Sequence, residues 1–238
     1  MIDWLRREEP SLELGGGTLP VIVRRHPTAR RMTLRLAQDG REVRVTIPRW
    51  GRTADALAFA RAKRDWLAAQ VAALPEVEPL ADGATLRFRG EPLRLTHREE
   101  APRRATLADG ALIVGGPDAG LPGRVTRWLR SEAMTLLTAD LAEYSQRAGQ
   151  PTPRLALSNA KRRWGSCAQD GTIRVNWRLV MAPDFVRRSV VAHEIAHLVH
   201  FDHSPAFHAL LGDLFEGDIR AANLWLKREG RSLYLPLG

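Results

Sequence analysis

The sequence predicts an α+β fold, in which an antiparallel, β-rich N-terminal part with one helix precedes a mainly helical half with a small sheet. Three observations predict this order. Short β-branched segments separated by glycine turns fill the chain up to about residue 116. Glycine and proline cluster at 115–123, and apolar residues beyond them recur every three or four positions. We therefore expect a loosely held arm at 1–16, a β-rich domain at 17–116 and a second domain at 117–238.

The strands of the β-rich part are short segments with partly alternating apolar residues, at 19–25, 30–37, 42–48, 84–96 and 104–116. An Asp39-Gly40 pair separates the second from the third. This pair predicts an antiparallel ribbon, because it tolerates the positive φ of hairpin turns. Gly90 and Asp109-Gly110 predict further hairpins in the same way. Between the two groups of strands, Thr53 can cap a helix that runs to about Leu74.

The second half should begin with a long helix over 124–147, whose apolar residues have helical spacing. A strand pair then interrupts the helices, because 154–160 is followed by a segment, 172–180, in which apolar and polar residues alternate. Pro183 suits the first turn of the next helix, which should end near Phe201.

The composition predicts a folded protein of the cytoplasm. The chain has 238 residues, of which 44% are apolar, enough for the core of one large or two small domains. It contains no secretory signal pattern and no run of eighteen apolar residues. The single cysteine, Cys167, cannot form an internal disulfide, which agrees with a reducing compartment.

The positive charge is concentrated in one segment. Residues 24–64 contain twelve basic and three acidic residues, so this segment alone carries the +9 of the whole chain. Such a patch can attract nucleic acid or another polyanion. The pattern also suits an ordinary solvated face, because no nucleic-acid motif or aromatic stacking pattern accompanies it. Both interpretations stay open.

Most histidines are crowded into one stretch, since five of the seven lie within 190–208. His193 and His197 are four residues apart, which on a helix places both side chains on one face, about 6 Å apart along the axis. With Glu194 they form the His-Glu-x-x-His arrangement of zinc hydrolases. Zinc takes four ligands in tetrahedral geometry, and a catalytic site keeps one position for water. The pattern therefore predicts a zinc site that needs a third protein ligand.

Three further histidines are candidates for that ligand: His200, His203 and His208. His200 shares the helical face but lies about 10 Å along the axis from the first ligand, which strains binding to one ion. Ser204 is a good N-cap and Pro205 a good first helical residue, so the chain should reverse just before them. His203 lies in that reversal and is the expected ligand, with His200 second. For His208, inside the next helix, we expect a packing or supporting role.

Glu194 follows the first ligand directly and can lean over the open coordination position. Zinc lowers the pKa of bound water from about 15.7 to about 7 and polarises a carbonyl or phosphoryl oxygen. A carboxylate at this place can accept the proton of the water and pass it to the leaving group. We therefore expect Glu194 to be the general base of a hydrolase.

Longer motifs around these residues are shared with a known family. They are "RWGSC" at 163–167, "GTIRVNWRLVMAP" at 171–183, "VVAHEIAHLVHFDHSPAFH" at 190–208 and "WLKREG" at 225–230. With upstream segments from about residue 20, the chain closely resembles the YgjP-like metallopeptidase-domain family. The resemblance implies a zincin-type fold in the second half, in which a small sheet lies beside the active-site helix. It also implies His193, His197 and His203 as zinc ligands and Glu194 as the catalyst.

The resemblance does not fix the substrate, because members of the family are described as metal-dependent hydrolases or metallopeptidases, and some as nucleotide (UTP) pyrophosphatases. Two positions depart from related patterns. His208 stands where many relatives have Trp. His200 occupies the glycine position of the metzincin proteases, whose ligand spacing the chain otherwise shares.

Candidates for substrate binding are Arg163, Ser166, Asn176, Arg178 and His200. A peptidase pairs an extended substrate with an edge strand, for which Thr172 to Val180 is the candidate, unless it is an ordinary core strand. Arg163 can stabilise an oxyanion or bind phosphate, and Ser166 can orient substrate. We expect Trp164 in the core and Cys167 in a structural role, with thiolate ligation of zinc as the lesser alternative.

Three hypotheses of function follow, with no indication of the oligomeric state. We favour a zinc-dependent peptidase acting on peptides or proteins. The second hypothesis is a nucleoside triphosphate pyrophosphatase, in which 161–163, Arg174 and Arg178 hold phosphates, although a glycine-rich phosphate loop and a carboxylate cluster are missing. The third is a nucleic-acid-associated module with a structural metal. Candidates for a carboxylate that orients a histidine are Asp202, Asp213 and Glu216.

Overall fold

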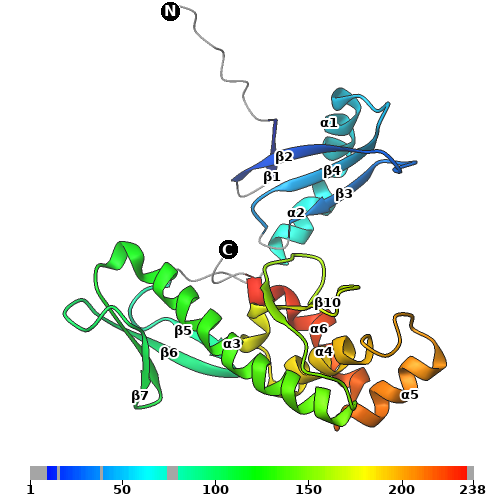
Figure 1. Cartoon of the computed structure of the whole chain (residues 1–238). Helices are drawn as coiled ribbons and strands as arrows, with labels where there is room; N and C mark the ends of the chain where they lie inside the picture. Colours follow the sequence, from blue (N-terminus) through cyan, green and yellow to red (C-terminus); the bar gives the residue numbers. More distant parts are fainter. Residues whose placement is uncertain (1–9, 15–16, 38–39, 74–79, 235–238) are drawn as a thin grey trace, which may run out of the picture. The chain divides into compact units, whose positions relative to one another are not determined.

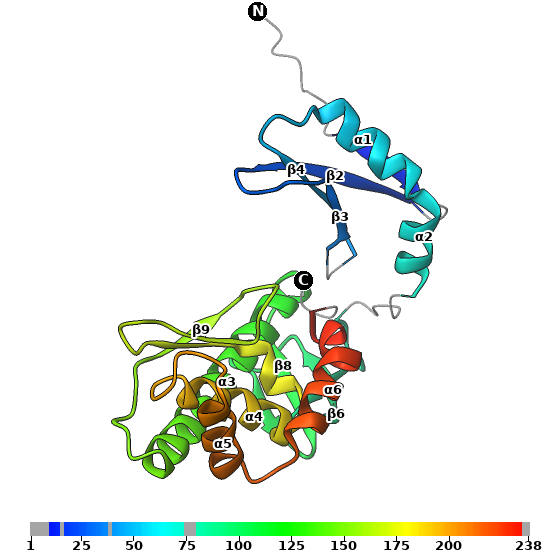
Figure 2. The same ribbon diagram turned by 90° about the vertical axis from the view of Figure 1, so that its right-hand side faces the viewer.

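The computed structural model describes residues 10–14, 17–37, 40–73 and 80–234. The chain divides into two compact units, Met1–Glu76 and Val77–Gly238, each with its own apolar core (Figures 1 and 2). The predicted α+β class is confirmed, with β-rich segments first and helices dominating the end of the chain. Within the described ranges, no helix is long and apolar enough to cross a bilayer.

The first unit is a four-stranded sheet packed against two helices. Its elements are β1 (Ser11–Leu14), β2 (Gly17–His26), β3 (Thr33–Leu36), β4 (Val43–Pro48), α1 (Thr53–Ala62) and α2 (Arg64–Ala72). The strand order is β1-β2-β4-β3. The predicted hairpin of β3 and β4 is confirmed, but β2 pairs with β4 in parallel, so the sheet is mixed.

Two local predictions in this unit differ from the structure. β1 belongs to the segment expected to be a loose arm, yet it pairs with β2, and Leu12 and Leu14 are buried in the core. Thr53 is not the cap of α1, because Arg52 holds the N-cap position and the Thr53 hydroxyl instead accepts a hydrogen bond from Arg25. The expected single helix is divided between α1 and α2 at Lys63, and its predicted end at Leu74 lies outside the described residues.

One face of this sheet is apolar and buried, and the other is open and basic. Along β4, Val43 and Val45 are buried while Arg44 between them is exposed. Arg35 lies directly opposite Arg44 in the β3–β4 ladder, and Arg24 is exposed on β2. The basic segment therefore places several arginines on an open sheet face. Binding of nucleic acid to this face stays a prediction.

The second unit combines two small sheets with four helices among its described residues. Its elements are β5 (Thr85–Phe88), β6 (Glu91–Arg98), β7 (Thr106–Ala108), β8 (Ala111–Gly115), η1 (Asp118–Gly120), α3 (Leu121–Arg147), β9 (Leu155–Ser158), β10 (Gly165–Cys167), β11 (Ile173–Asn176), η2 (Trp177–Met181), α4 (Asp184–Ala196), α5 (Pro205–Leu214), α6 (Ile219–Glu229) and η3 (Gly230–Tyr234). The hairpins β5–β6 and β7–β8 have the predicted turns. Leu129 and Leu137 of α3 lie in the centre of the core.

The border between the units differs from the expected one at 116/117, because the β5–β8 sheet shares the core of α3. Leu95 and Leu112 of this sheet are fully buried in that core. The β5–β6 turn also docks onto the second half, where the Arg89 and Gly90 N–H groups donate to the carbonyls of residues 180 and 181. Gly90 has φ of +89°, and a Cβ there would lie 2.9 Å from Pro183, so only glycine fits. The Gly/Pro cluster is thus a connection inside one unit.

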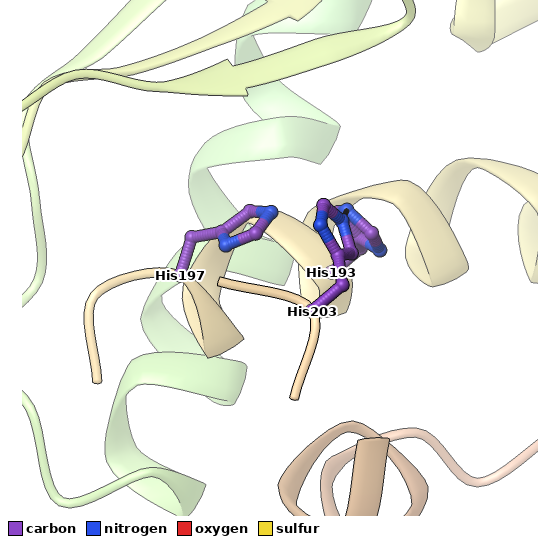
Figure 3. A group of neighbouring side chains, drawn as sticks. All are labelled: His193, His197 and His203. Carbon is purple, nitrogen blue, oxygen red and sulfur yellow. Dashed lines mark hydrogen bonds between the residues drawn. The ribbon is translucent and has the colours of Figure 1, made fainter. Parts of the chain in front are cut away.

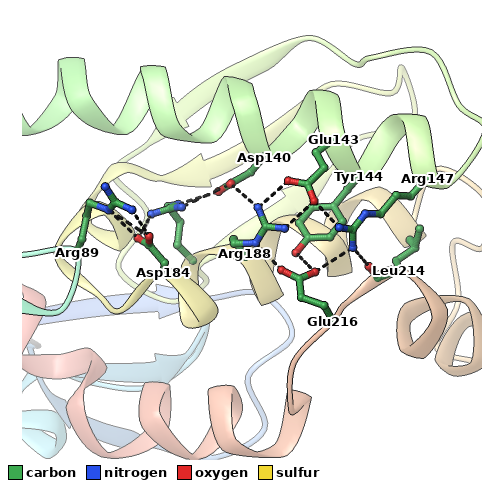
Figure 4. A network of polar contacts seen from close by, with 10 residues as sticks. Arg89, Asp140, Glu143, Tyr144, Arg147, Asp184, Arg188, Leu214 and Glu216 are labelled. Carbon is green, nitrogen blue, oxygen red and sulfur yellow. Dashed lines mark hydrogen bonds and ion pairs between the residues drawn. The ribbon is translucent and has the colours of Figure 1, made fainter.

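A network of ion pairs holds α3 against α4 and the segment after α5 (Figure 4). Arg187 and Asp140 form its buried part, with Nε and Oδ2 2.7 Å apart. Arg188 pairs with Glu143 at 2.7 Å and with Glu216 at 2.6 Å. Because these contacts fix α4 on both sides, they set the position of the helix that carries His193 and Glu194.

Candidate metal centre

The three expected ligands come from the end of α4 and the reversal that follows it. Helix α4 buries the apolar face predicted for it, but it ends at its C-cap His197, earlier than the expected end near Phe201. The chain then turns back. Ser204 caps α5 as predicted, because its hydroxyl accepts a hydrogen bond from the Phe207 N–H, and Pro205 is the first helical residue.

This reversal brings His193, His197 and His203 together (Figure 3). One ring nitrogen from each lies within 4.8 Å of the other two. The Nε2 atoms of His193 and His203 are 3.3 Å apart. A tetrahedral zinc ion with metal–nitrogen distances of about 2.05 Å separates two of its nitrogen ligands by about 3.3 Å. The spacing of this pair and the three-nitrogen donor set therefore fit zinc.

Two contacts hold these rings in place. Nδ1 of His197 lies 3.0 Å from the carbonyl oxygen of His200, which accepts a hydrogen bond and leaves Nε2 directed at the other rings. Phe207 is fully buried and packs against all three histidines, with ring centroids 4.6–4.9 Å away. Burial, together with the neighbouring histidines, lowers the pKa of His193 to about 4. Its imidazole is therefore neutral at pH 7, the form that binds a metal.

The other candidates for a metal ligand or an orienting carboxylate have different contacts. His200 contributes its carbonyl, and the exposed His208 has its ring centroid 6.3 Å from that of His203. Asp202 accepts a hydrogen bond from the Ser204 N–H, and Glu216 binds Arg188 and Tyr144. Asp213 is exposed on α5. The contact that orients His197 is therefore a backbone carbonyl, which no side-chain pattern in the sequence could reveal.

Glu194 lies beside the histidines and is buried, with 5% of its surface exposed. Burial raises its pKa to about 7, against the opposing charge of Arg163 and a hydrogen bond from the Cys167 backbone. Its carboxylate touches the backbone of β10. A Cβ on Gly165 would lie 2.3 Å from Oε1 of Glu194, so the absence of a side chain at residue 165 makes room for this carboxylate.

The five predicted substrate-binding residues separate into two groups. Arg163 is exposed near Glu194, Ser166 lies on β10, and His200 adjoins His197. Asn176 is fully buried, and its amide donates to the carbonyl of Ala160 and to the Tyr234 hydroxyl.

Arg178 is buried as well. Its guanidinium lies over the rings of Trp177 and Tyr234, at 4.3 and 4.7 Å from their centroids, and donates to Asn159. Asn176 and Arg178 thus hold the loop before β10 through their hydrogen bonds to Ala160 and Asn159. The alternation along 172–180 placed them on a polar face, but the turn into η2 buries them instead.

Of the two interpretations of Thr172 to Val180, the edge strand is wrong and the inner strand is found. β11, within Thr172–Val180, is the middle strand of the sheet β10-β11-β9. The edge beside α4 is β10, whose Gly165 lies against Glu194. The Trp164 carbonyl accepts a hydrogen bond from the Asn176 N–H, and the Ala168 N–H donates to the Thr172 carbonyl. Because backbone groups alternate in direction along an antiparallel strand, those of Gly165 and Cys167 point toward the free edge. The Cys167 thiol is half-buried and outside the histidine group; burial raises its pKa.

A cavity of about 210 Å³ adjoins His193, one of the three histidines. Its walls are Trp164 and Gly165 before and on β10, His193 and Glu194 on α4, and side chains of α5 and α6. Trp164 is half-buried as a cavity wall, rather than wholly in the core. Its ring packs against Tyr234 and against Gly230, where a Cβ would lie 2.8 Å from Cζ2.

A histidine triad beside a buried carboxylate, on a helix that faces a small sheet, defines the class of metal-dependent hydrolases. The YgjP-like, metallopeptidase domain family matches residues 30–229. The chain therefore belongs to the YgjP-like metallopeptidase-domain family, and it is a metallopeptidase-like hydrolase whose family implies a divalent metal.

Among solved structures the chain is similar to the metallopeptidase zymogen abylysin of Pyrococcus abyssi, with 19% identity and a TM-score of 0.36. That alignment covers 43% of this chain and 99% of abylysin. The similarity is too low to carry an argument. No curated protein matches the chain.

Proposed function

We propose that this protein is a zinc-dependent peptidase in which His193, His197 and His203 hold the metal and Glu194 is the general base. The observation that carries the proposal is the convergence of three imidazoles within 4.8 Å beside a buried carboxylate. Zinc held there supplies a polarising charge for the substrate carbonyl and lowers the pKa of water to about 7.

The chain's own residues perform the proton transfers. Glu194 accepts a proton from the attacking water and donates it to the amine that leaves when the peptide bond breaks. Because Gly165 has no side chain, the Glu194 carboxylate can lie against β10, and the sheet fixes the position of this carboxylate. The charge of Arg163 favours the ionised form of Glu194, which is the form that accepts the proton.

The free edge of β10 is the proposed place for the substrate backbone. Peptide recognition by strand addition needs an unpaired edge next to the reacting groups, and β10 meets both conditions among the described strands. The backbone groups of Gly165 and the carbonyl of Cys167 face this edge, while the Cys167 N–H donates to Glu194. A substrate strand here would pass along the side of α4 that carries Glu194.

The test compares peptides and nucleoside triphosphates as substrates of zinc-loaded protein, with Glu194→Gln as the blank. We expect peptide cleavage by the native protein, and loss of turnover with unchanged zinc content in the variant. Release of pyrophosphate without peptide cleavage would overturn the proposal. Hydrolysis by Glu194→Gln at the native rate would remove Glu194 from the mechanism.

The nucleotide alternative rests on one observation. Arg162 and Arg163 are exposed on the loop before β10, and the charge of Arg163 reaches Glu194. Guanidinium groups at such a place can bind phosphate. Arg178, also expected to bind phosphate, is buried below the loop, which weakens this alternative.

A further inference from the structure

We propose that the cavity beside the histidines is a specificity pocket that takes one large apolar side chain of a peptide substrate. The inference rests on the proposed peptidase function and names the substrate class. His193 and Glu194 both line the cavity. A side chain that enters it therefore belongs to a residue that flanks the scissile bond.

The lining determines which chemistry fits. Apart from Glu194 and His193, its walls are mainly apolar: Trp164, Val190, Leu211, Ile219 and Leu226. Ser189 also lines it, but its hydroxyl already donates to the Val186 carbonyl. Asn223 is exposed and supplies the remaining polar group of the lining. Apolar atoms thus form slightly more than half of the exposed wall.

Charge disfavours acidic and basic side chains in the cavity. The cavity lining contains no Lys or Arg. An acidic side chain would meet the Glu194 carboxylate, and the nearest cation, Arg163, does not line the cavity. A basic side chain would pair with the carboxylate that the reaction needs free. A neutral apolar side chain is neither repelled by the Glu194 carboxylate nor paired with it.

The size of the cavity points to a Leu, Met or Phe side chain. A cavity of about 150 Å³ with apolar walls holds a benzene ring. The 210 Å³ beside α4 can therefore take a phenyl or isobutyl group. Ile219 and Leu226 lie on one face of α6, so this helix forms the wall opposite α4 and limits the length of the side chain.

The first experiment needs no turnover. Methyl NMR of Ile219, Leu211 and Leu226 in metal-free protein should show shifts on adding N-acetyl-phenylalaninamide, and none on adding N-acetyl-aspartamide. The second compares cleavage by zinc-loaded protein of peptides that differ at one residue beside the scissile bond. Phe or Leu should exceed Ala by at least about tenfold in kcat/KM, the discrimination typical of an apolar pocket.

A matched pair of variants locates the effect. Leu226→Trp fills the cavity and should abolish both the shifts and the preference, whereas Leu224→Trp alters an exposed residue of the same helix and should leave both unchanged. Peptide cleavage without apolar preference, or equal behaviour of the two variants, would overturn the pocket while leaving the peptidase intact. Probe binding that Leu226→Trp removes, in a protein that cleaves no peptide, would instead refute the proposed function.

Discussion

Gly165→Ala tests whether the close approach of β10 positions the catalytic carboxylate. The added Cβ would lie 2.3 Å from Oε1 and 2.7 Å from Cδ of Glu194, whereas ordinary contacts begin at 3.4 Å. The carboxylate must therefore retreat by about 1 Å, a displacement that typically lowers catalysis by about 100-fold. Residue 165 has no positive φ, so alanine suits the backbone and the fold should persist.

The assay measures kcat, KM and zinc content of the Gly165→Ala protein on the substrate that the native protein hydrolyses. We expect kcat to fall by about 100-fold, or about 2.7 kcal/mol in activation free energy, with zinc content unchanged. Gly212→Ala is the matched control, because a Cβ there meets nothing within 4 Å. A native kcat for Gly165→Ala would refute the positioning argument, as would an equal loss in the control.

Three further predictions concern the metal and the stability of the fold. His203→Ala should weaken zinc binding by more than about 100-fold, which exceeds the loss typical of a supporting contact, whereas His208→Ala should not. Competition with a chelator measures the zinc affinity of both variants. Equal affinities would remove His203 from the ligand set. Asp140→Ala leaves the buried Arg187 without its main partner and should lower the free energy of unfolding in urea by about 3 kcal/mol; a loss below about 1 kcal/mol would contradict this. Burial raises the pKa of Glu216, but hydrogen bonds from Arg188 and others outweigh it and lower the value from 4.5 to about 2. Its carboxylate therefore stabilises the fold above pH 4.5, and this contribution disappears as the pH falls toward 2. Glu216→Gln should flatten the decline of melting temperature over this range, and an unchanged decline would exclude Glu216 as its source.

The sequence predicted those features of the candidate site that depend on local geometry. The four-residue spacing of His193 and His197 fixes their common face on any helix. Ser204 and Pro205 mark the start of the next helix through their own backbone preferences, so the reversal that brings His203 back could be predicted. Their roles as metal ligands remain predictions.

Features that depend on contacts between distant segments escaped prediction. Asn176 and Arg178 follow the alternation of a half-exposed strand, yet η3 and the loop before β10 cover them. The cluster of glycine and proline at 115–123 has the composition of a domain border, but the docking of the β5–β6 turn against Pro183 decides the division. In both cases the local pattern is typical of the predicted feature. It contains no information about the distant segment that packs against it.

Two other contacts join the separate short motifs that carry the resemblance to the family. Trp164 and Gly165 are neighbours in "RWGSC", and they touch two different elements: Trp164 packs against Gly230 of "WLKREG", and Gly165 against Glu194. One residue thus forms a wall of the cavity while the next fixes the carboxylate. A side chain added at Gly230 would push the Trp164 ring, whereas one added at Gly165 would push Glu194. In the proposed peptidase, substrate selection and proton transfer therefore depend on two adjacent residues, Trp164 just before β10 and Gly165 on it. The motifs, distant in sequence, constrain each other because they meet there.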